Sequence, residues 1–136
     1  MKKYKFLIVA STFYPEITEN LLNGAQNFLK KNGHDFDVYY TKGSLEIPTK
    51  ISIKLKKQKY DAVVAIGCII RGKTDHYEFI ASAITNTLLE ISINNKLPVS
   101  NSVLTCENIK QAKERSLNKI NRAKEAVEAA ISVIED

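Results

Sequence analysis

One short segment of the sequence combines the residue types that anion binding and proton transfer need. Residues 67–76 read Gly-Cys-Ile-Ile-Arg-Gly-Lys-Thr-Asp-His and lie between an apolar run and an amphipathic stretch. Gly72 allows close backbone approach, Thr74 offers a hydroxyl, and the first amides of a following helix carry partial positive charge, so a phosphate could bind here. His76 follows directly, and histidine is the side chain that exchanges a proton near neutral pH. A capping loop with a solvent-facing histidine would have the same sequence, so both interpretations stay open.

Three residues elsewhere in the chain could complete a site around this segment. Glu46, within residues 43–48, could accept hydrogen bonds from ligand hydroxyls or only complement the dipole of the helix that it precedes. Phe13 could stack on a planar ligand or fold into the core, and its place after an apolar run slightly favours the ligand. Arg115 could clamp a phosphate or lie in solvent.

Apolar periodicity predicts the elements that must position these residues. The runs that suit strands are Phe6–Ala10, Phe36–Tyr40, Ala62–Ile66 and Val99–Leu104. The stretches that suit helices are one that ends at Gly33, one that starts near Pro48, and others at about 76–94, 108–115 and 121–134. This alternation predicts an α/β fold of one domain, 1–136, with a parallel sheet between helices on both faces. Ligands bind beyond the carboxyl ends of the strands in such sheets, which is where the candidate residues fall.

Composition and charge narrow the classes of function. The 136 residues are 44% hydrophobic and 26% charged, as in ordinary globular chains, and no apolar run is long enough for a membrane helix. The net charge is +5, with lysines gathered around residues 50–59, where a solvated helix face is favoured over a nucleic-acid site. The nucleotide motifs G-x-x-x-x-G-K-[ST] and G-x-G-x-x-G are absent.

The cysteines and histidines do not predict a metal site. Cys68, Cys106, His34 and His76 lack paired ligand spacing, so we expect no metal. Cys68 is expected to be a buried structural cysteine. Two cysteines are too few for a secreted disulfide scaffold, so we expect a cytoplasmic protein.

Three blocks of the sequence resemble the lumazine synthase family. Residues 67–76 resemble the family motif G-x-[IV]-I-R-G-x-T-x-H, and residues 43–48, Gly-Ser-Leu-Glu-Ile-Pro, resemble G-[AS]-x-E-[IL]-P. The third block, residues 104–115, contains Leu-Thr-Cys-Glu-Asn and then Gln-Ala and Glu-Arg. The resemblance covers nearly the whole chain and implies a flavodoxin-like, three-layer α/β/α sandwich with a four-stranded parallel sheet.

The resemblance also implies an activity. It is the condensation of 5-amino-6-(D-ribitylamino)uracil with 3,4-dihydroxy-2-butanone 4-phosphate to 6,7-dimethyl-8-ribityllumazine, phosphate and water, without metal or organic cofactor. This transferase reaction is the penultimate step of riboflavin biosynthesis. The alternative from another class is a non-enzymatic, flavodoxin-like module that binds flavin or lumazine.

The resemblance assigns a role to each part of the predicted site. For the pyrimidine substrate, the matching residues are Phe13 for stacking, Ser44, Leu45 and Glu46 for the ribityl chain, and Cys68, Ile69 and Ile70 for the backbone wall. For phosphate and proton transfer, they are Lys73, Thr74, His76 and, from a neighbouring subunit, Arg115. The expected partners are therefore these two small molecules and further copies of the chain.

Two segments depart from the family pattern. Asn101 stands where the family often has phenylalanine, so a polar contact would replace an aromatic one. Residues 116–123 replace a glycine-rich connection and are one residue shorter, with Lys119 or Arg122 in place of its lysine. Because that connection helps to pack pentamers into a shell, we expect a pentamer rather than a sixty-subunit particle.

Overall fold

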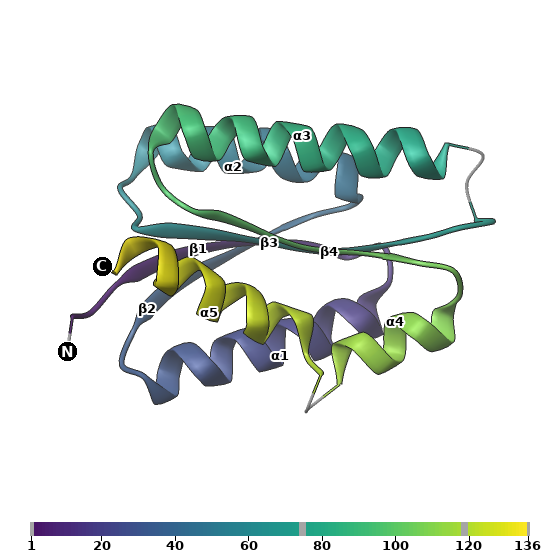
Figure 1. Ribbon diagram of the computed structural model, residues 1–136, viewed down its shortest axis with the longest axis horizontal. Helices are drawn as coiled ribbons and strands as arrows, with labels where there is room; N and C mark the ends of the chain where they lie inside the picture. The colour runs from purple at the N-terminus through teal and green to yellow at the C-terminus, as the bar shows by residue number, and fades with distance from the viewer. Residues whose placement is uncertain (1, 74–75, 118–119, 136) are drawn as a thin grey trace.

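The computed structural model describes residues 2–73, 76–117 and 120–135, and within them four parallel strands form a sheet with helices on both faces (Figure 1). The elements in chain order are β1 (Lys5–Ser11), α1 (Pro15–Lys31), β2 (Asp35–Thr41), the short 3-10 helix η1 (Ser44–Glu46), α2 (Ile47–Lys57), β3 (Ala62–Ile70), α3 (Tyr77–Asn95), β4 (Val99–Cys106), α4 (Ile109–Ser116) and α5 (Arg122–Ile134). The strand order is β2-β1-β3-β4, that of flavodoxin-like sheets. The predicted fold class is confirmed.

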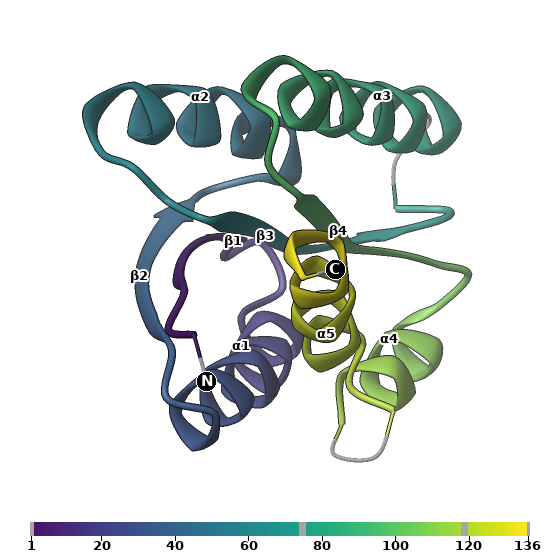
Figure 2. The ribbon, with the colours of Figure 1, turned by 60° about the vertical axis from the view of Figure 1, so that its left-hand side comes forward.

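The sheet divides the apolar core into two layers. Helices α2 and α3 lie on one face, and α1, α4 and α5 lie on the other (Figures 1 and 2). Side chains alternate along β1 accordingly: Leu7 and Val9 pack toward α2 and α3, whereas Phe6 and Ile8 pack toward α1 and α5. All nine residues of β3 are buried, as expected for a central strand covered on both sides.

All four strands end later than their sequences predict, and the difference is largest in β3 and β4. β3 reaches Ile70 and β4 reaches Cys106, where the predicted ends were Ile66 and Leu104. The glycine that suggested a loop, Gly67, lies inside β3 because η1 approaches the strand there: a Cβ atom at Gly67 would stand 2.7 Å from the hydroxyl oxygen of the adjacent η1 serine. The prediction that β3 ends before Gly67 is therefore wrong.

The predicted helices are confirmed to within a few residues. Pro15 is the first residue of α1, and Gly33, at φ +76°, stops the chain from continuing this helix. The inner face of α3 buries Ile84, Leu88 and Ile91. Among the described residues, no helix has the length and apolar composition to cross a membrane.

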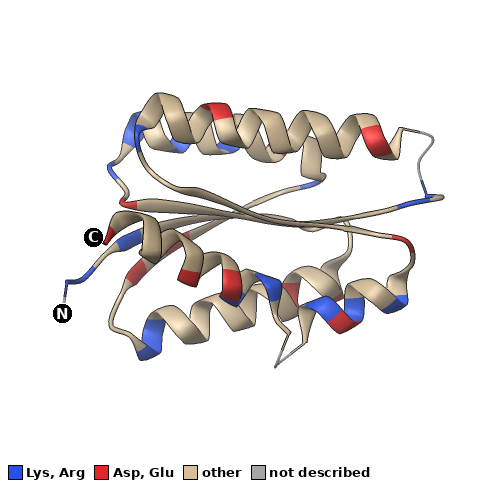
Figure 3. Cartoon of the chain, in the orientation of Figure 1, with Lys and Arg blue, Asp and Glu red and all other residues tan. Residues whose placement is uncertain are grey.

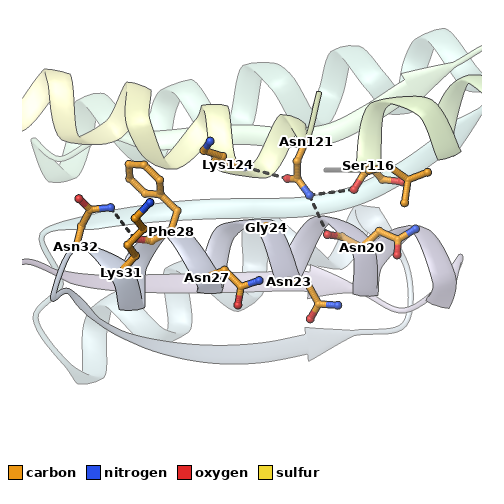
Figure 4. Close-up of a pocket in the computed structure, with 11 residues that line it drawn as sticks. Asn20, Asn23, Gly24, Asn27, Phe28, Lys31, Asn32, Ser116, Asn121 and Lys124 are labelled. Atoms are coloured by element: carbon orange, nitrogen blue, oxygen red, sulfur yellow. Dashed lines mark hydrogen bonds between the residues drawn. The ribbon is translucent and has the colours of Figure 1, made fainter. Parts of the chain in front are cut away.

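Asn121 fastens the connection between α4 and α5 to α1 (Figure 4). Its side-chain nitrogen donates to the carbonyl oxygens of Asn20, at 2.8 Å, and Ser116, at 2.9 Å. Its side-chain oxygen caps α5 by accepting from the amides of Ala123 and Lys124, each at 3.0 Å. The amide group fits because α1 has Gly24 there: a Cβ atom at that position would lie 2.3 Å from the Asn121 side chain.

We predict that Gly24→Ala destabilises the protein, although alanine ordinarily stabilises a helix relative to glycine by about 1 kcal/mol. The new methyl group must displace Asn121, and overpacking of this kind costs about 1–3 kcal/mol. Urea unfolding at a fixed subunit concentration measures the difference. The exposed neighbour substitution Asn23→Ala should be close to neutral, and Gly24→Ala should become stabilising in an Asn121→Ala background. A stabilised Gly24→Ala protein would contradict the packing argument.

Candidate active site

The carboxyl end of β3 has one unpaired edge. β1 pairs with β3 only as far as Ile66, whereas β4 accompanies β3 to Ile70. Within the described residues, β3 therefore has a strand on one side beyond Ile66, and Cys68, Ile69 and Ile70 line a pocket of about 250 Å³. Backbone N–H and C=O groups along such an edge can bind the donor and acceptor groups of a planar ligand, as a further strand would.

Most of the predicted site residues meet at this pocket. Those that line it are Phe13, Ser44, Leu45, Glu46, Cys68, Ile69, Ile70 and Lys73. Three lining residues had no predicted role: Tyr14, Gly43 and Ile80. Tyr14 follows Phe13 and Gly43 begins a motif block, so position in the chain could have indicated both. Ile80 could be assigned only to the inner face of its helix.

Two aromatic rings form one wall of the pocket. Phe13 is 66% exposed, and its ring meets the ring of Tyr14 edge-on, with centroids 5.1 Å apart. Burial and the neighbouring Cys68 thiol raise the pKa of Tyr14 above its ordinary value, so its hydroxyl stays protonated at neutral pH. The wall therefore offers an exposed face for stacking beside a hydrogen-bond donor.

The helix η1 supplies the polar groups of the opposite wall. The backbone N–H of Gly43 donates to Glu46 Oε1 at 2.8 Å and holds this carboxylate at the pocket. Ser44 is 8% exposed, and its Oγ has no hydrogen-bond partner in the part of the chain that the structure describes. Buried hydroxyls are normally satisfied, so this one is an exception beside the pocket.

The thiol of Cys68 forms part of the pocket but is not a nucleophile. A hydrogen bond with Cys106, together with burial, raises the pKa of Cys68. The same hydrogen bond and the nearby Arg115 lower the pKa of Cys106 to about 7, with Arg115 Nη1 3.7 Å from its Sγ. Cys68 therefore remains a thiol, and its 4% exposure agrees with the predicted buried cysteine.

The predicted anion-binding loop is only partly described. Gly72, at φ +84°, turns the chain after β3, and the Lys73 backbone N–H closes this turn on Ile70 O at 3.2 Å. Thr74 lies outside the described residues. His76 is the exposed N-cap residue of α3, with its ring centroid 6.5 Å from that of Phe79, and it does not line the pocket. The structure thus brings Lys73 to the pocket and His76 to the adjoining helix end.

Two predicted residues lie away from the pocket of their own chain. Arg115, on α4, donates from Nη1 to Thr105 O at 3.3 Å. Asn101 lies in the middle of the edge strand β4 and contacts Thr85 of α3 at 3.4 Å. In the altered connection, Arg122 pairs with Glu125 of its own helix at 2.9 Å, and Lys119 lies outside the described residues.

A larger groove of about 500 Å³ lies elsewhere, between α1 and the start of α5 (Figure 4). Its walls carry mainly amide and lysine side chains, and it lies away from the carboxyl ends of the strands. The smaller pocket has the unpaired strand edge, the exposed ring and the unsatisfied hydroxyl, so it is the better candidate site. Across the described ranges, no three His, Cys, Asp or Glu side chains gather as metal ligands would.

Comparisons with known proteins agree with one another over nearly the full chain. The family model described as 6,7-dimethyl-8-ribityllumazine synthase matches residues 3–136. The 6,7-dimethyl-8-ribityllumazine synthase of Bartonella bacilliformis is 40% identical over 131 residues, which are 94% of this chain and 86% of that protein. The proteins of the same name from Methylorubrum populi and Methylorubrum extorquens are each 35% identical over 136 residues, covering 96% of this chain and 80% and 79% of theirs.

We predict that Ser44→Ala does not lower the free energy of unfolding of the unliganded protein. Removal of an unsatisfied buried hydroxyl should be neutral or stabilising by up to about 1 kcal/mol. Ser116→Ala is the matched control because Ser116 is 1% exposed and donates to Lys113 O at 3.0 Å. That control should lose about 1 kcal/mol in the same urea titration. Equal losses in the two variants would show that Ser44 has a structural partner.

Proposed function

The chain belongs to the 6,7-dimethyl-8-ribityllumazine synthase family, and from this premise we propose that the pocket at the end of β3 is its active site. The chain is a transferase of riboflavin biosynthesis. It condenses 5-amino-6-(D-ribitylamino)uracil with 3,4-dihydroxy-2-butanone 4-phosphate to 6,7-dimethyl-8-ribityllumazine, phosphate and water. The relatives named above are synthases, which leaves the non-enzymatic binding module without support.

The unpaired edge of β3 is the observation that carries the assignment of the pocket. A pyrimidinedione ring has alternating N–H and C=O groups, which match the donors and acceptors of a free strand edge. The Phe13 ring stacks on this planar ligand. The ribityl chain brings hydroxyl groups, which Ser44 Oγ and the Glu46 carboxylate bind.

The loop after β3 handles the phosphate and the protons in the same proposal. Lys73 contributes a positive charge beside the pocket, and Thr74 and the first amides of α3 add hydrogen-bond donors. Imine formation, phosphate elimination and ring closure each move protons, and His76 relays them. Much of the remaining rate enhancement comes from holding two substrates in one orientation.

A homo-oligomer, and specifically a pentamer, completes each site. Arg115 and Asn101 do not line the pocket of their own chain, so in this proposal they serve that of a neighbour. The outer face of α3 supports such contacts, because Phe79, Leu89 and Ile93 are 77%, 55% and 73% exposed. The two buried thiols, present without a disulfide, fit the reducing cytoplasm, where we expect the protein to act.

The assay that tests this function mixes the protein with the two substrates and follows lumazine fluorescence. The control is the same mixture with heat-denatured protein, which measures any condensation that occurs without catalyst. We expect product formation above this background, proportional to protein concentration. A rate equal to the background would contradict the proposed function.

His76→Ala should lower kcat by about 10- to 10⁴-fold while the protein stays folded, because it removes the proton relay. Lys57→Ala, an exposed change at the end of α2, is the control and should retain wild-type kcat. If the His76→Ala variant had the wild-type kcat at every pH between 6 and 8, His76 would have no part in the mechanism.

Mixed oligomers test whether Arg115 acts in a neighbouring site. Arg115→Ala and His76→Ala chains should each be impaired alone. When equal amounts are unfolded and reassembled together, about one quarter of the sites should combine an intact His76 with an intact neighbouring Arg115, since each is present with even odds. Recovery of about that fraction of activity, in a particle of five chains by light scattering, is the expected result. No recovery would place both residues in one chain's site, and full activity at the mass of one chain would refute the shared site.

A further inference from the structure

Arg71 joins three elements at the edge of the candidate active site. It follows the last residue of β3, and its Nε donates to Glu107 Oε1, at 3.1 Å, in the connection between β4 and α4. Its Nη1 donates to Glu78 Oε1, at 3.2 Å, in the first turn of α3. The guanidinium also lies 4.5 Å above the ring of Tyr77. Figure 3 shows this basic segment between acidic segments at the end of β4 and the start of α3.

These contacts span the two ends of the loop that carries Lys73 and His76. At the entry, the Arg71 backbone N–H donates to Cys106 O at 2.8 Å, which fixes the residue to β4. At the exit, the α3 turn that begins at His76 contains both Tyr77 and Glu78. The Arg71 side chain thus holds the exit of the loop against its entry, and the pocket lies between Lys73 and the β3 edge.

We propose that Arg71 is a positioning residue, which sets the place of Lys73 and His76 relative to the pocket through its contacts with Glu78 and Glu107. This inference rests on the proposed function. Arg71 is not itself the anion receptor, because one positive charge shared by two carboxylates leaves the cluster net negative. Nor is it chiefly a source of stability: its side chain is 47% exposed, and exposed ion pairs contribute little to folding.

The test begins with Arg71→Ala and a matched control. Lys5→Ala also removes a cation that pairs with a carboxylate, Asp37 at 3.5 Å, and lies over a ring, Tyr60 at 5.7 Å, but at the amino edge of the sheet. A misplaced catalytic group can lower the reaction rate by up to about 100-fold. We therefore expect kcat/KM for the four-carbon phosphate to fall about 10- to 100-fold in Arg71→Ala and to stay unchanged in Lys5→Ala. The KM for the pyrimidine should stay within about twofold, and the two variants should have similar Tm values. Arg71→Lys, which can pair with only one carboxylate, should restore part of the loss.

A double-mutant cycle separates positioning from direct contact with substrate. In a Glu78→Gln/Glu107→Gln background the linkage is already weakened, so Arg71→Ala should change kcat/KM by less than about twofold. The same loss in both backgrounds would mean that Arg71 acts on the substrate directly and would overturn the proposal. Equal increases in the KM values of both substrates, or no change in kcat/KM for the four-carbon phosphate, would overturn it as well.

Inorganic phosphate provides a readout that does not need turnover. By calorimetry, Arg71→Ala should weaken phosphate binding, whereas Lys5→Ala should not. An unchanged Kd in the Arg71 variant would overturn the proposal. If the wild-type chain bound phosphate but formed no lumazine, the proposed function would fail while this measurement still decided the role of Arg71.

Discussion

The site depends on how far each of the two strands that flank β3 continues alongside it. β1 stops pairing with β3 at Ile66, and β4 continues alongside β3 to Ile70. The backbone beyond Ile66 is therefore held straight by one neighbour and left unpaired on its other side. η1 can approach that side only because Gly67 lacks a side chain, which brings Ser44 and Glu46 to the same opening. The end of the β1 pairing at Ile66 thus creates both the cavity and its hydrogen-bonding edge.

The burial of β3 on both faces has a further consequence for assembly. A strand without exposed residues needs a helical layer on each side, and the four-stranded sheet offers each layer only a narrow surface. α3 buries Ile84, Leu88 and Ile91 against the sheet and leaves Phe79 and Ile93 outward. The apolar content of this helix exceeds what its own sheet can cover, which favours contact with a second chain.

Periodicity predicted the alternation of elements, because it reports on nearby chain, and the resemblance to the family supplied most of the pocket residues. They failed where the outcome depends on distant partners. The end of β3 could not be predicted, because Cys68-Ile69-Ile70 after a glycine suits either a loop or a strand, and the β4 register decides. The pairing of Arg71 with Glu107 depends on the same register across 36 positions. The unsatisfied hydroxyl of Ser44 appears only when every surrounding group is placed.

The register of β3 with β4 also connects the pocket of a chain to Arg115, the residue that would serve a neighbour's pocket in the proposed pentamer. Cys68 lines the pocket, and the neighbouring Cys106 on β4 contributes to the raised pKa of its thiol. The guanidinium of Arg115 in turn donates hydrogen bonds to Cys106 Sγ and to Thr105 O. A shift of β4 along β3 would therefore move Arg115 and also deform the pocket wall. Because packed strands shift in whole residues rather than by small increments, the β4 register would fix the geometry of adjacent sites together in the proposed pentamer.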